Sequence, residues 1–269
     1  MAESTEISWA HSTFNPWIGC TRVSPGCDNC YAATLMQDRY GRVKWGAGEA
    51  RQRTKTWDQP RRWNAQAAAS GKPWRVFCAS LADVFDNEVP VEWRMELFEL
   101  IRETPHLTWM LLTKRIGNVE DMLPGGWYAG AEAPNGPYPN VWLGITVVNQ
   151  VEANRDIPKL LAVPAAVRWL SMEPLLGPVS FRWAPWRPLS RERNTDHLDG
   201  LRMLDWVIVG GESGANARPM SAELVRTIRD QCAEAGVPFH FKQWGGVRPK
   251  AGGHLLDGVE HRAFPPKRT

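Results

Sequence analysis

The stretch "LTWMLLTKR" (107–115) combines a continuous apolar run with a cationic end. An unbroken apolar run of this length is typical of a parallel strand that is covered on both faces of its sheet. The preceding stretch "VEWRMELFELIRET" (91–104) repeats apolar residues near the 3.6-residue period of a helix. These apolar residues are Met95, Leu97, Phe98 and Ile101. We therefore expect a helix followed by a buried strand, which is one unit of an alternating α/β fold.

Six further stretches have the composition of strands, with helical stretches between them. They are "TFNPWIG" (13–19), "WRVFCASLADVFD" (74–86), "NVWLGITVVN" (140–149), "VRWLSMEPLLGPV" (167–179), "LDWVIVGGESG" (204–214) and "VPFHFKQWG" (237–245). Strands that alternate with helices imply parallel pairing through right-handed crossovers. We predict an α/β fold, a partial (open) β/α barrel with about six parallel strands, over residues 1–246. It carries a basic insertion at about 42–63 and ends in a short C-terminal tail at 247–269. Residues 125–140 and 181–200 are interpreted as further insertions.

Bulk composition narrows the class of protein. The 269 residues are 43% hydrophobic and 23% charged, with a net charge of +3, which is ordinary for a globular domain. No apolar run approaches the roughly 20 residues that span a bilayer, and the N-terminal stretch lacks the pattern of a signal peptide. We therefore expect a cytoplasmic monomer with no membrane partner. Five cysteines in a reducing compartment favour thiolate or metal chemistry over disulfides.

Nearly every predicted strand finishes in a polar or charged side chain. In β/α barrels, active-site residues gather at the C-terminal ends of the strands, and a purely structural sheet would not need such groups there. The side chains at these ends are Ser80, Asp83, Lys114, Thr146, Glu173, Glu212, Lys242 and Trp244. They are the candidate binding residues, with surface or salt-bridged roles as the alternative for each.

Three of the five cysteines lie in one short stretch, "GCTRVSPGCDNC" (19–30). Cys20, Cys27 and Cys30 are spaced C-x6-C-x2-C, and a helix is predicted from about Tyr31. Structural zinc closes its shell with four protein ligands, so a zinc site would need a fourth residue, of which His11 is nearest in sequence. We favour a [4Fe–4S] cluster held by three thiolates, which leaves one iron open to a small molecule. The zinc site and three cysteines without a metal remain alternatives.

Three cysteines in the loop after the first strand of a β/α series resemble the radical S-adenosylmethionine superfamily, although its common spacing is C-x3-C-x2-C. The blocks "TFNPW-GC", "SPGC-NCYA" and "GGESG" also resemble a phage-associated family that implies no particular substrate. The superfamily resemblance implies S-adenosylmethionine as a second cofactor and an external electron donor, with formation of a 5′-deoxyadenosyl radical. It further implies that strand-end residues bind the cofactor. The candidates are Ser80, Asp83, Lys114, Thr146, Glu173 and Glu212.

The stretch "FCAS" (77–80) places Cys78 and Ser80 two residues apart, hence on the same face of a strand. Together with "CDNCY" and "TKR", this stretch resembles spore photoproduct lyases. The resemblance implies that Cys78 donates a hydrogen atom, that Tyr31 assists radical return, and that Lys114 binds the cofactor carboxylate. A buried core role is the alternative for Cys78, since free cysteine is among the most buried residue types.

The basic segment (residues 42–63) holds seven Lys or Arg against two acids, with three interleaved tryptophans. Cations for phosphates and flat rings for bases indicate a nucleic-acid surface, while a solvated loop with inward-packed tryptophans is the alternative. The candidate contacts are Arg51, Arg53, Lys55, Trp57, Arg61 and Arg62.

Taken together, the motifs predict a radical enzyme that acts on nucleic acid, with DNA preferred over RNA. Its sharpest version is direct repair of a thymine photolesion, because a lesion-repair enzyme must bind the phosphate backbone and extrude its target bases. Two alternatives remain. One is radical modification of RNA, a nucleotide or a small metabolite. The other is a non-catalytic, zinc-stabilised nucleic-acid-binding module.

Overall fold

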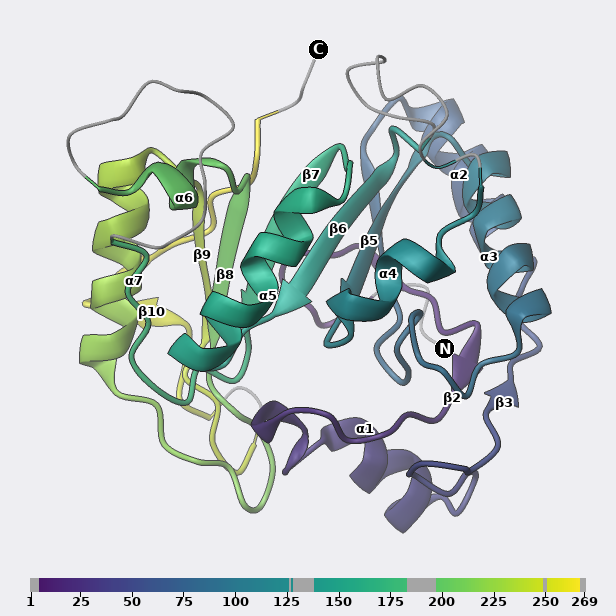
Figure 1. The fold of residues 1–269 in the computed structure, drawn as a ribbon, viewed down its shortest axis with the longest axis horizontal. Coiled ribbons are helices and arrows are strands. Elements are labelled where there is room, and N and C mark those ends of the chain that lie inside the picture. Colours follow the sequence, from purple (N-terminus) through teal and green to yellow (C-terminus); the bar gives the residue numbers. More distant parts are fainter. Residues whose placement is uncertain (1–4, 126, 128–137, 183–196, 249–250, 267–269) are drawn as a thin grey trace. The chain divides into compact units, whose positions relative to one another are not determined.

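The structure, a computed structural model, describes residues 5–125, 127, 138–182, 197–248 and 251–266. Within these residues the main sheet has seven strands in the order β1-β4-β5-β6-β7-β8-β9 (Figure 1). The strands are β1 (Ser12–Thr13), β4 (Trp74–Cys78), β5 (Leu107–Thr113), β6 (Val141–Thr146), β7 (Val167–Met172), β8 (Trp206–Gly210) and β9 (Phe239–Gln243). Pairs β1/β4, β4/β5, β7/β8 and β8/β9 are all parallel. The predicted fold class, an open β/α sheet of parallel strands, is confirmed.

Helices connect these strands in the predicted alternation. They are α1 (Tyr31–Ala33), α2 (Gln59–Ser70), α3 (Val91–Glu103), α4 (Ile116–Met122), α5 (Gln150–Ala162), α6 (Asp199–Arg202) and α7 (Ala222–Ala235), with a 3-10 turn η1 (Pro25–Cys27) and a π-helix η2 (Thr34–Arg39). Two small antiparallel pairs complete the fold: β2 (Trp17–Ile18) with β3 (Gln52–Arg53), and β10 (Leu255–Leu256) with β11 (Val259–Glu260). No helix in the described residues is both long and apolar enough to cross a membrane.

The first strand is shorter than the sequence suggests. Only Ser12 and Thr13 pair with β4, and the Phe14 amide extends the ladder with a 2.9 Å bond to the Phe77 carbonyl. The pairing stops there because Pro16 has no N–H to donate and because the Asn15 side chain accepts the Leu81 amide at 2.7 Å. The chain then continues into β2, so the single strand predicted over 13–19 is in fact two short strands that belong to different sheets.

The helices follow from local signals and from burial. Helix α3 buries Leu97, Phe98 and Ile101, whereas Met95 is 45% exposed and does not belong to the packing face. The basic segment was predicted as an insertion, but its last part begins α2, which buries Trp63. Helix α7 begins at an N-cap, because the Ser221 hydroxyl accepts the Glu223 amide at 3.3 Å.

The chain forms two compact units, each with its own aromatic core. The first unit comprises residues 1–24, 30–144 and 163–166, and the second comprises 25–29, 145–162 and 167–269. In the first, the fully buried rings of Phe14 and Trp109 pack edge to face at 5.8 Å. In the second, Trp169 and Trp206 lie 5.9 Å apart.

Large aromatic rings contribute much buried apolar area, so several of the fifteen tryptophans serve the two cores. The C-terminal stretch belongs to the second core as well, since the Phe241 amide donates to the His261 carbonyl at 3.0 Å. Most of the two stretches interpreted as insertions, 125–140 and 181–200, lies outside the described residues.

Candidate functional site

The cysteine loop carries three free thiols, all partly exposed. Cys20 follows β2, Cys27 ends the 3-10 turn, and Cys30 is the N-cap residue of α1, so the predicted helix start at Tyr31 is correct. Cys20 and Cys30 belong to the first unit and Cys27 to the second. Three thiols are a donor set suited to zinc or an iron–sulfur cluster, so the chemistry of these ligands fits the proposed metal group.

In the described residues, neither the three thiols alone nor the thiols with other ligand types, His, Asp or Glu, form a group that could hold a metal ion. His11, the alternative fourth ligand, uses its Nδ1 to accept the Arg75 amide at 2.8 Å. The cluster assignment therefore stays a prediction that rests on the cysteine motif.

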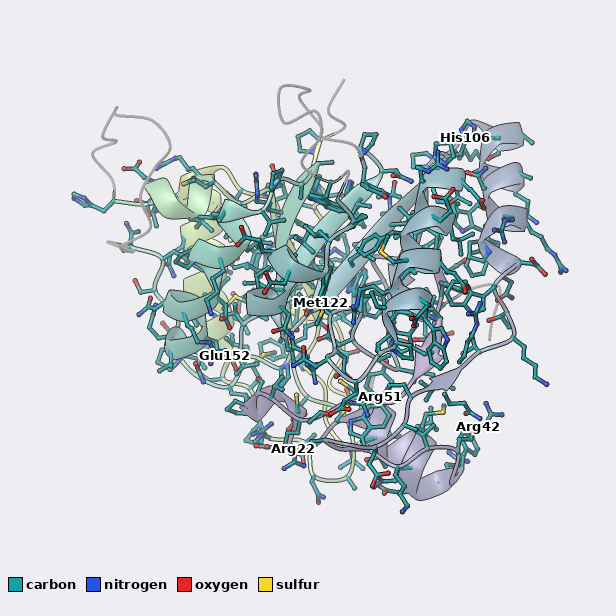
Figure 2. The ribbon with its side chains drawn as sticks, turned by 45° about the vertical axis from the view of Figure 1, so that its right-hand side comes forward. Arg22, Arg42, Arg51, His106, Met122 and Glu152 are labelled. Carbon is teal, nitrogen blue, oxygen red and sulfur yellow. The ribbon has the colours of Figure 1, made fainter. Side chains whose placement is uncertain are left out.

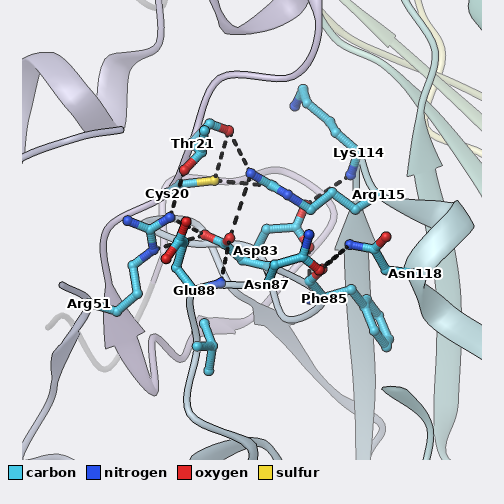
Figure 3. A network of polar contacts seen from close by, with 12 residues as sticks. Cys20, Thr21, Arg51, Asp83, Phe85, Asn87, Glu88, Lys114, Arg115 and Asn118 are labelled. Carbon is cyan, nitrogen blue, oxygen red and sulfur yellow. Dashed lines mark hydrogen bonds and ion pairs between the residues drawn. The ribbon is translucent and has the colours of Figure 1, made fainter. Parts of the chain in front are cut away.

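Arg115 is the side chain that contacts the first cysteine (Figure 3). Its Nη1 donates to Cys20 Sγ at 3.4 Å and to Asp83 Oδ2 at 3.1 Å, and its Nη2 donates to the Thr21 carbonyl at 2.6 Å. The Arg115 side chain is only 7% exposed. Sequence analysis singled out the neighbouring Lys114 instead, although both cations end the same strand-like stretch.

The Asp83 carboxylate holds the ends of β4 and β5 together. It accepts bonds from the Thr113 hydroxyl at 2.8 Å, the Lys114 amide at 3.0 Å and the Phe85 amide at 3.0 Å, besides the ion pair with Arg115. Asp83 was predicted to bind cofactor, and the structure engages its carboxylate with these four protein donors. Lys114 takes part in this group through its backbone amide.

Burial sets the charge state of the free Cys20 thiol. Removal from water, helped by the nearby Asp83 carboxylate, raises the pKa of Cys20 to about 12, and the Arg115 guanidinium opposes this shift. Burial lowers the pKa of Arg115, but Asp83, Cys20 and Asp86 together outweigh it, and the pKa is raised. Without a metal, Cys20 is therefore a neutral thiol beside a fixed cation at neutral pH.

The structure brings Tyr31 and Ser80 together, which were both predicted site residues. The Tyr31 hydroxyl donates to the Ser80 carbonyl at 2.7 Å, and the Asn15 amide donates to the Ser80 hydroxyl at 3.1 Å. Cys78 is fully buried, and burial raises its pKa. Because β4 ends at Cys78, the alternation expected to place Cys78 and Ser80 on one strand face does not extend to Ser80. The two residues are nevertheless neighbours at the end of the same strand.

In the second unit, Glu212 and Arg218 fasten the other part of the cysteine loop. Arg218 binds Glu212 with two donors at 2.7 and 2.9 Å, and it also donates to the Pro25 carbonyl at 2.9 Å and to Asp28 at 3.2 Å. The Asn29 amide donates to Glu212 at 2.9 Å. Glu212 was predicted to bind cofactor, and here its carboxylate connects the "GGESG" block to the "SPGCDNC" block. Neither Arg218 nor Asn29 was singled out from the sequence.

Glu173 and Lys242, at the ends of β7 and β9, form an ion pair of 2.6 Å. Gly210 lies against this pair, because a Cβ there would come within 3.0 Å of the Glu173 carboxylate. Thr146, at the end of β6, is 3% exposed. Trp244 donates its Nε1 to the Leu255 carbonyl at 2.8 Å. Several predicted strand-end residues are therefore already engaged with the protein.

Some cations of the basic segment already bind acidic or aromatic side chains of the protein. Arg51 is 6% exposed and donates to Asp86 at 2.9 Å. Arg53 pairs with Glu96 at 2.5 Å and lies 4.2 Å from the centre of the Trp57 ring. These three predicted contacts, Arg51, Arg53 and Trp57, have protein partners.

The other part of the segment offers exposed positive charge. Arg61 pairs with Glu103 at 2.6 Å, but four exposed cations have no ion pair within the part of the chain that the structure describes. They are Arg42, Lys44, Lys55 and Arg62. Figure 2 shows Arg42 at the outside of the molecule and Arg51 among other side chains. The position of each cation relative to acidic partners was not visible in the sequence.

The contact between Glu212 and Arg218 can be tested by measuring how the stability of the fold changes at acid pH. Burial would raise its pKa, but hydrogen bonds from Arg218 and Asn29 hold the pKa below its usual value. A depressed pKa means that ionised Glu212 stabilises the fold above its unfolded pKa of about 4.3, and that this stabilisation is lost as the pH falls through the lower folded value. We expect Glu212→Gln to lower the free energy of unfolding by about 1–3 kcal/mol at pH 6 and by much less at pH 3. Urea unfolding across this range measures the difference, and a constant difference would contradict it.

Comparison with known proteins adds the family of the chain. A family model described as "Protein of unknown function (DUF5131)" matches residues 4–265. Neither the curated proteins nor the solved structures gave a match.

Proposed function

The chain belongs to the DUF5131 family, and we propose that it is a radical S-adenosylmethionine enzyme that acts on nucleic acid. The observation that carries the proposal is the free C-x6-C-x2-C thiol set, which follows the first strand of a parallel β/α sheet and leads into α1 at Cys30. Cys20, Cys27 and Cys30 would hold the [4Fe–4S] cluster. When bound, the cluster and S-adenosylmethionine supply the radical chemistry, with an external donor providing the electron.

The protein's contribution near the radical is argued from Cys78 and Tyr31. Cys78 is fully buried and its pKa is raised, so its sulfur keeps the hydrogen that a radical would take. In the proposed repair of a thymine photolesion, the substrate radical takes a hydrogen atom from the Cys78 thiol. Tyr31, which contacts the backbone two residues beyond Cys78, would then return a hydrogen atom to the cysteine sulfur, and the hydrogen atom that restores the tyrosine would come from the cofactor.

The proposed substrate class rests on the exposed cations Arg42, Lys44, Lys55 and Arg62. Exposed cations without acidic partners attract phosphates, because binding releases the condensed counterions of the nucleic acid. Exposed Tyr40, at 54%, adds an aromatic ring next to these residues in the sequence, and the Arg39 guanidinium lies 5.6 Å from its centre. Rings of this kind stack on unpaired bases.

Metal content is the first test of the proposal. We expect protein purified without oxygen to contain about four irons and four sulfides per chain, and to lose visible absorption when dithionite reduces it. The reduced protein should then cleave S-adenosylmethionine. One zinc without sulfide would reject the radical proposal and favour the zinc-stabilised binding module.

The role of Cys78 is tested against a matched cysteine. Cys232, on α7, is also fully buried with a raised pKa, but no predicted radical step involves it. We expect Cys78→Ala to retain S-adenosylmethionine cleavage while losing most conversion of a spore-photoproduct oligonucleotide, and Cys232→Ala to retain both. Cleavage without lesion conversion in the unmodified protein would instead indicate RNA, a nucleotide or a small metabolite as substrate.

The nucleic-acid surface predicts a change in salt dependence. If Arg62 contacts a phosphate of duplex DNA, Arg62→Ala lowers the slope of log K against log salt by about one. Arg226→Ala is the control, because it changes the net charge equally but removes a cation that is paired with Asp257 at 2.7 Å on α7. Fluorescence anisotropy with a labelled duplex measures both variants. Equal slopes for the two variants would exclude Arg62 as a contact.

A further inference from the structure

A buried charge cluster adjoins the first cysteine. It consists of Arg51, Arg94, Arg115, Asp83 and Asp86, whose exposed fractions lie between 1% and 7%. Arg51 pairs with Asp86 at 2.7 Å, and Arg115 pairs with Asp83 at 3.1 Å. The third guanidinium, that of Arg94, donates to the Val84 and Asp86 carbonyls at 2.9 and 2.8 Å. Three cations against two anions leave one positive charge in excess.

Two of the three arginines hold the chain at the first cysteine. Arg51 Nη2 donates to the Thr21 hydroxyl at 2.7 Å, and Arg115 Nη2 donates to the Thr21 carbonyl at 2.6 Å. Arg115 Nη1 then reaches Cys20 Sγ at 3.4 Å. An uncompensated buried charge is costly, and the Nη1–Sγ contact places a cation of this charge cluster directly at the sulfur that the proposed iron–sulfur cluster would use.

The three cysteines are unequal in this respect. Within the described residues, the sulfurs of Cys27 and Cys30 have no hydrogen-bond partner, whereas Cys20 has a permanently charged donor. Hydrogen bonds to ligand sulfurs and nearby charge are among the factors that set the reduction potential of an iron–sulfur cluster. A cation at one ligand favours the more negative, reduced state of the cluster, and so raises that potential.

We infer that Arg115 is a positioning residue that fixes Cys20 as a cluster ligand and makes the cluster easier to reduce. This inference rests on the proposed function, since it assigns a role toward the cluster that Cys20, Cys27 and Cys30 would hold. It adds to that function the residue through which the protein tunes electron uptake.

The test is the midpoint potential of the cluster, followed by electron paramagnetic resonance in a redox titration. We expect Arg115→Gln to lower the reduced-to-oxidised ratio at a fixed potential about tenfold, equal to about 59 mV for a one-electron couple. Arg115→Lys, which keeps the charge, should recover much of the ratio. Arg94→Met is the matched control, because it removes a cation of the same buried charge cluster that has no contact with Cys20. If Arg115→Gln and Arg94→Met shift the potential equally, the inference is wrong.

A second measurement uses the unmodified protein and so does not depend on a variant that folds. Arginine is labelled with nitrogen-15 at the guanidinium. Pulsed electron paramagnetic resonance of the reduced cluster should then detect a coupling between the cluster's electron spin and the Arg115 nitrogen, through the Nη1–H···Sγ bond. Absence of this coupling would overturn the inference while leaving the proposed function intact. Unmodified protein that binds zinc and no sulfide would reject the proposed function itself, so the two failures are distinguishable.

Discussion

In the first unit, the arrangement of the polar residues that follow β4 and β5 depends on the Asp83 carboxylate. It accepts the Phe85 amide from its own loop and the Lys114 amide and Thr113 hydroxyl from the end of β5. These bonds fix two neighbouring strand ends relative to each other. A buried carboxylate is costly unless its oxygens accept hydrogen bonds, so the contacts are necessary and not merely possible. Its ion pair with Arg115 then orients the guanidinium that reaches the cysteine loop.

The second unit uses the same construction with different residues. The Glu212 side chain is 5% exposed and binds Arg218 through both carboxylate oxygens. Arg218 in turn holds Pro25 and Asp28. In each unit a buried carboxylate therefore orients an arginine, and that arginine binds backbone oxygens of the cysteine loop. A planar guanidinium suits this task, since it presents several donors in a fixed geometry and stays charged.

Much of the fold was predictable because parallel strands buried on both faces leave a continuous apolar signature, as in β5. The break after β1 was not predictable, since the Asn15 side chain accepts a hydrogen bond from the amide of Leu81, which lies far along the chain. Among the candidate site residues, Asp83 and Glu212 were recognised as polar strand ends, but their partners Arg115 and Arg218 were not. A local pattern shows that a carboxylate ends a strand without showing which cation neutralises it.

The same limit explains why the sequence could not show which cations of the basic segment are buried and which are exposed. Arg51 and Arg62 look equivalent there, yet Arg51 is buried against Asp86, 35 positions later, and Arg62 faces solvent. Exposure is decided by where acidic partners lie in space, and only the fold supplies that information. Tryptophan has the same ambiguity: Trp63 is 2% exposed and serves the core, although its place directly after two cations suggested a stacking surface.

These contacts also bear on how the cysteine loop is ordered. In small zinc-finger domains the metal supplies the folding free energy, and the metal-free chain is unfolded. Here residues 20–21 are held by Arg51 and Arg115, and residues 25–29 by Glu212 and Arg218. The protein's own hydrogen bonds and ion pairs therefore contribute to ordering both parts of the loop, each within its own unit.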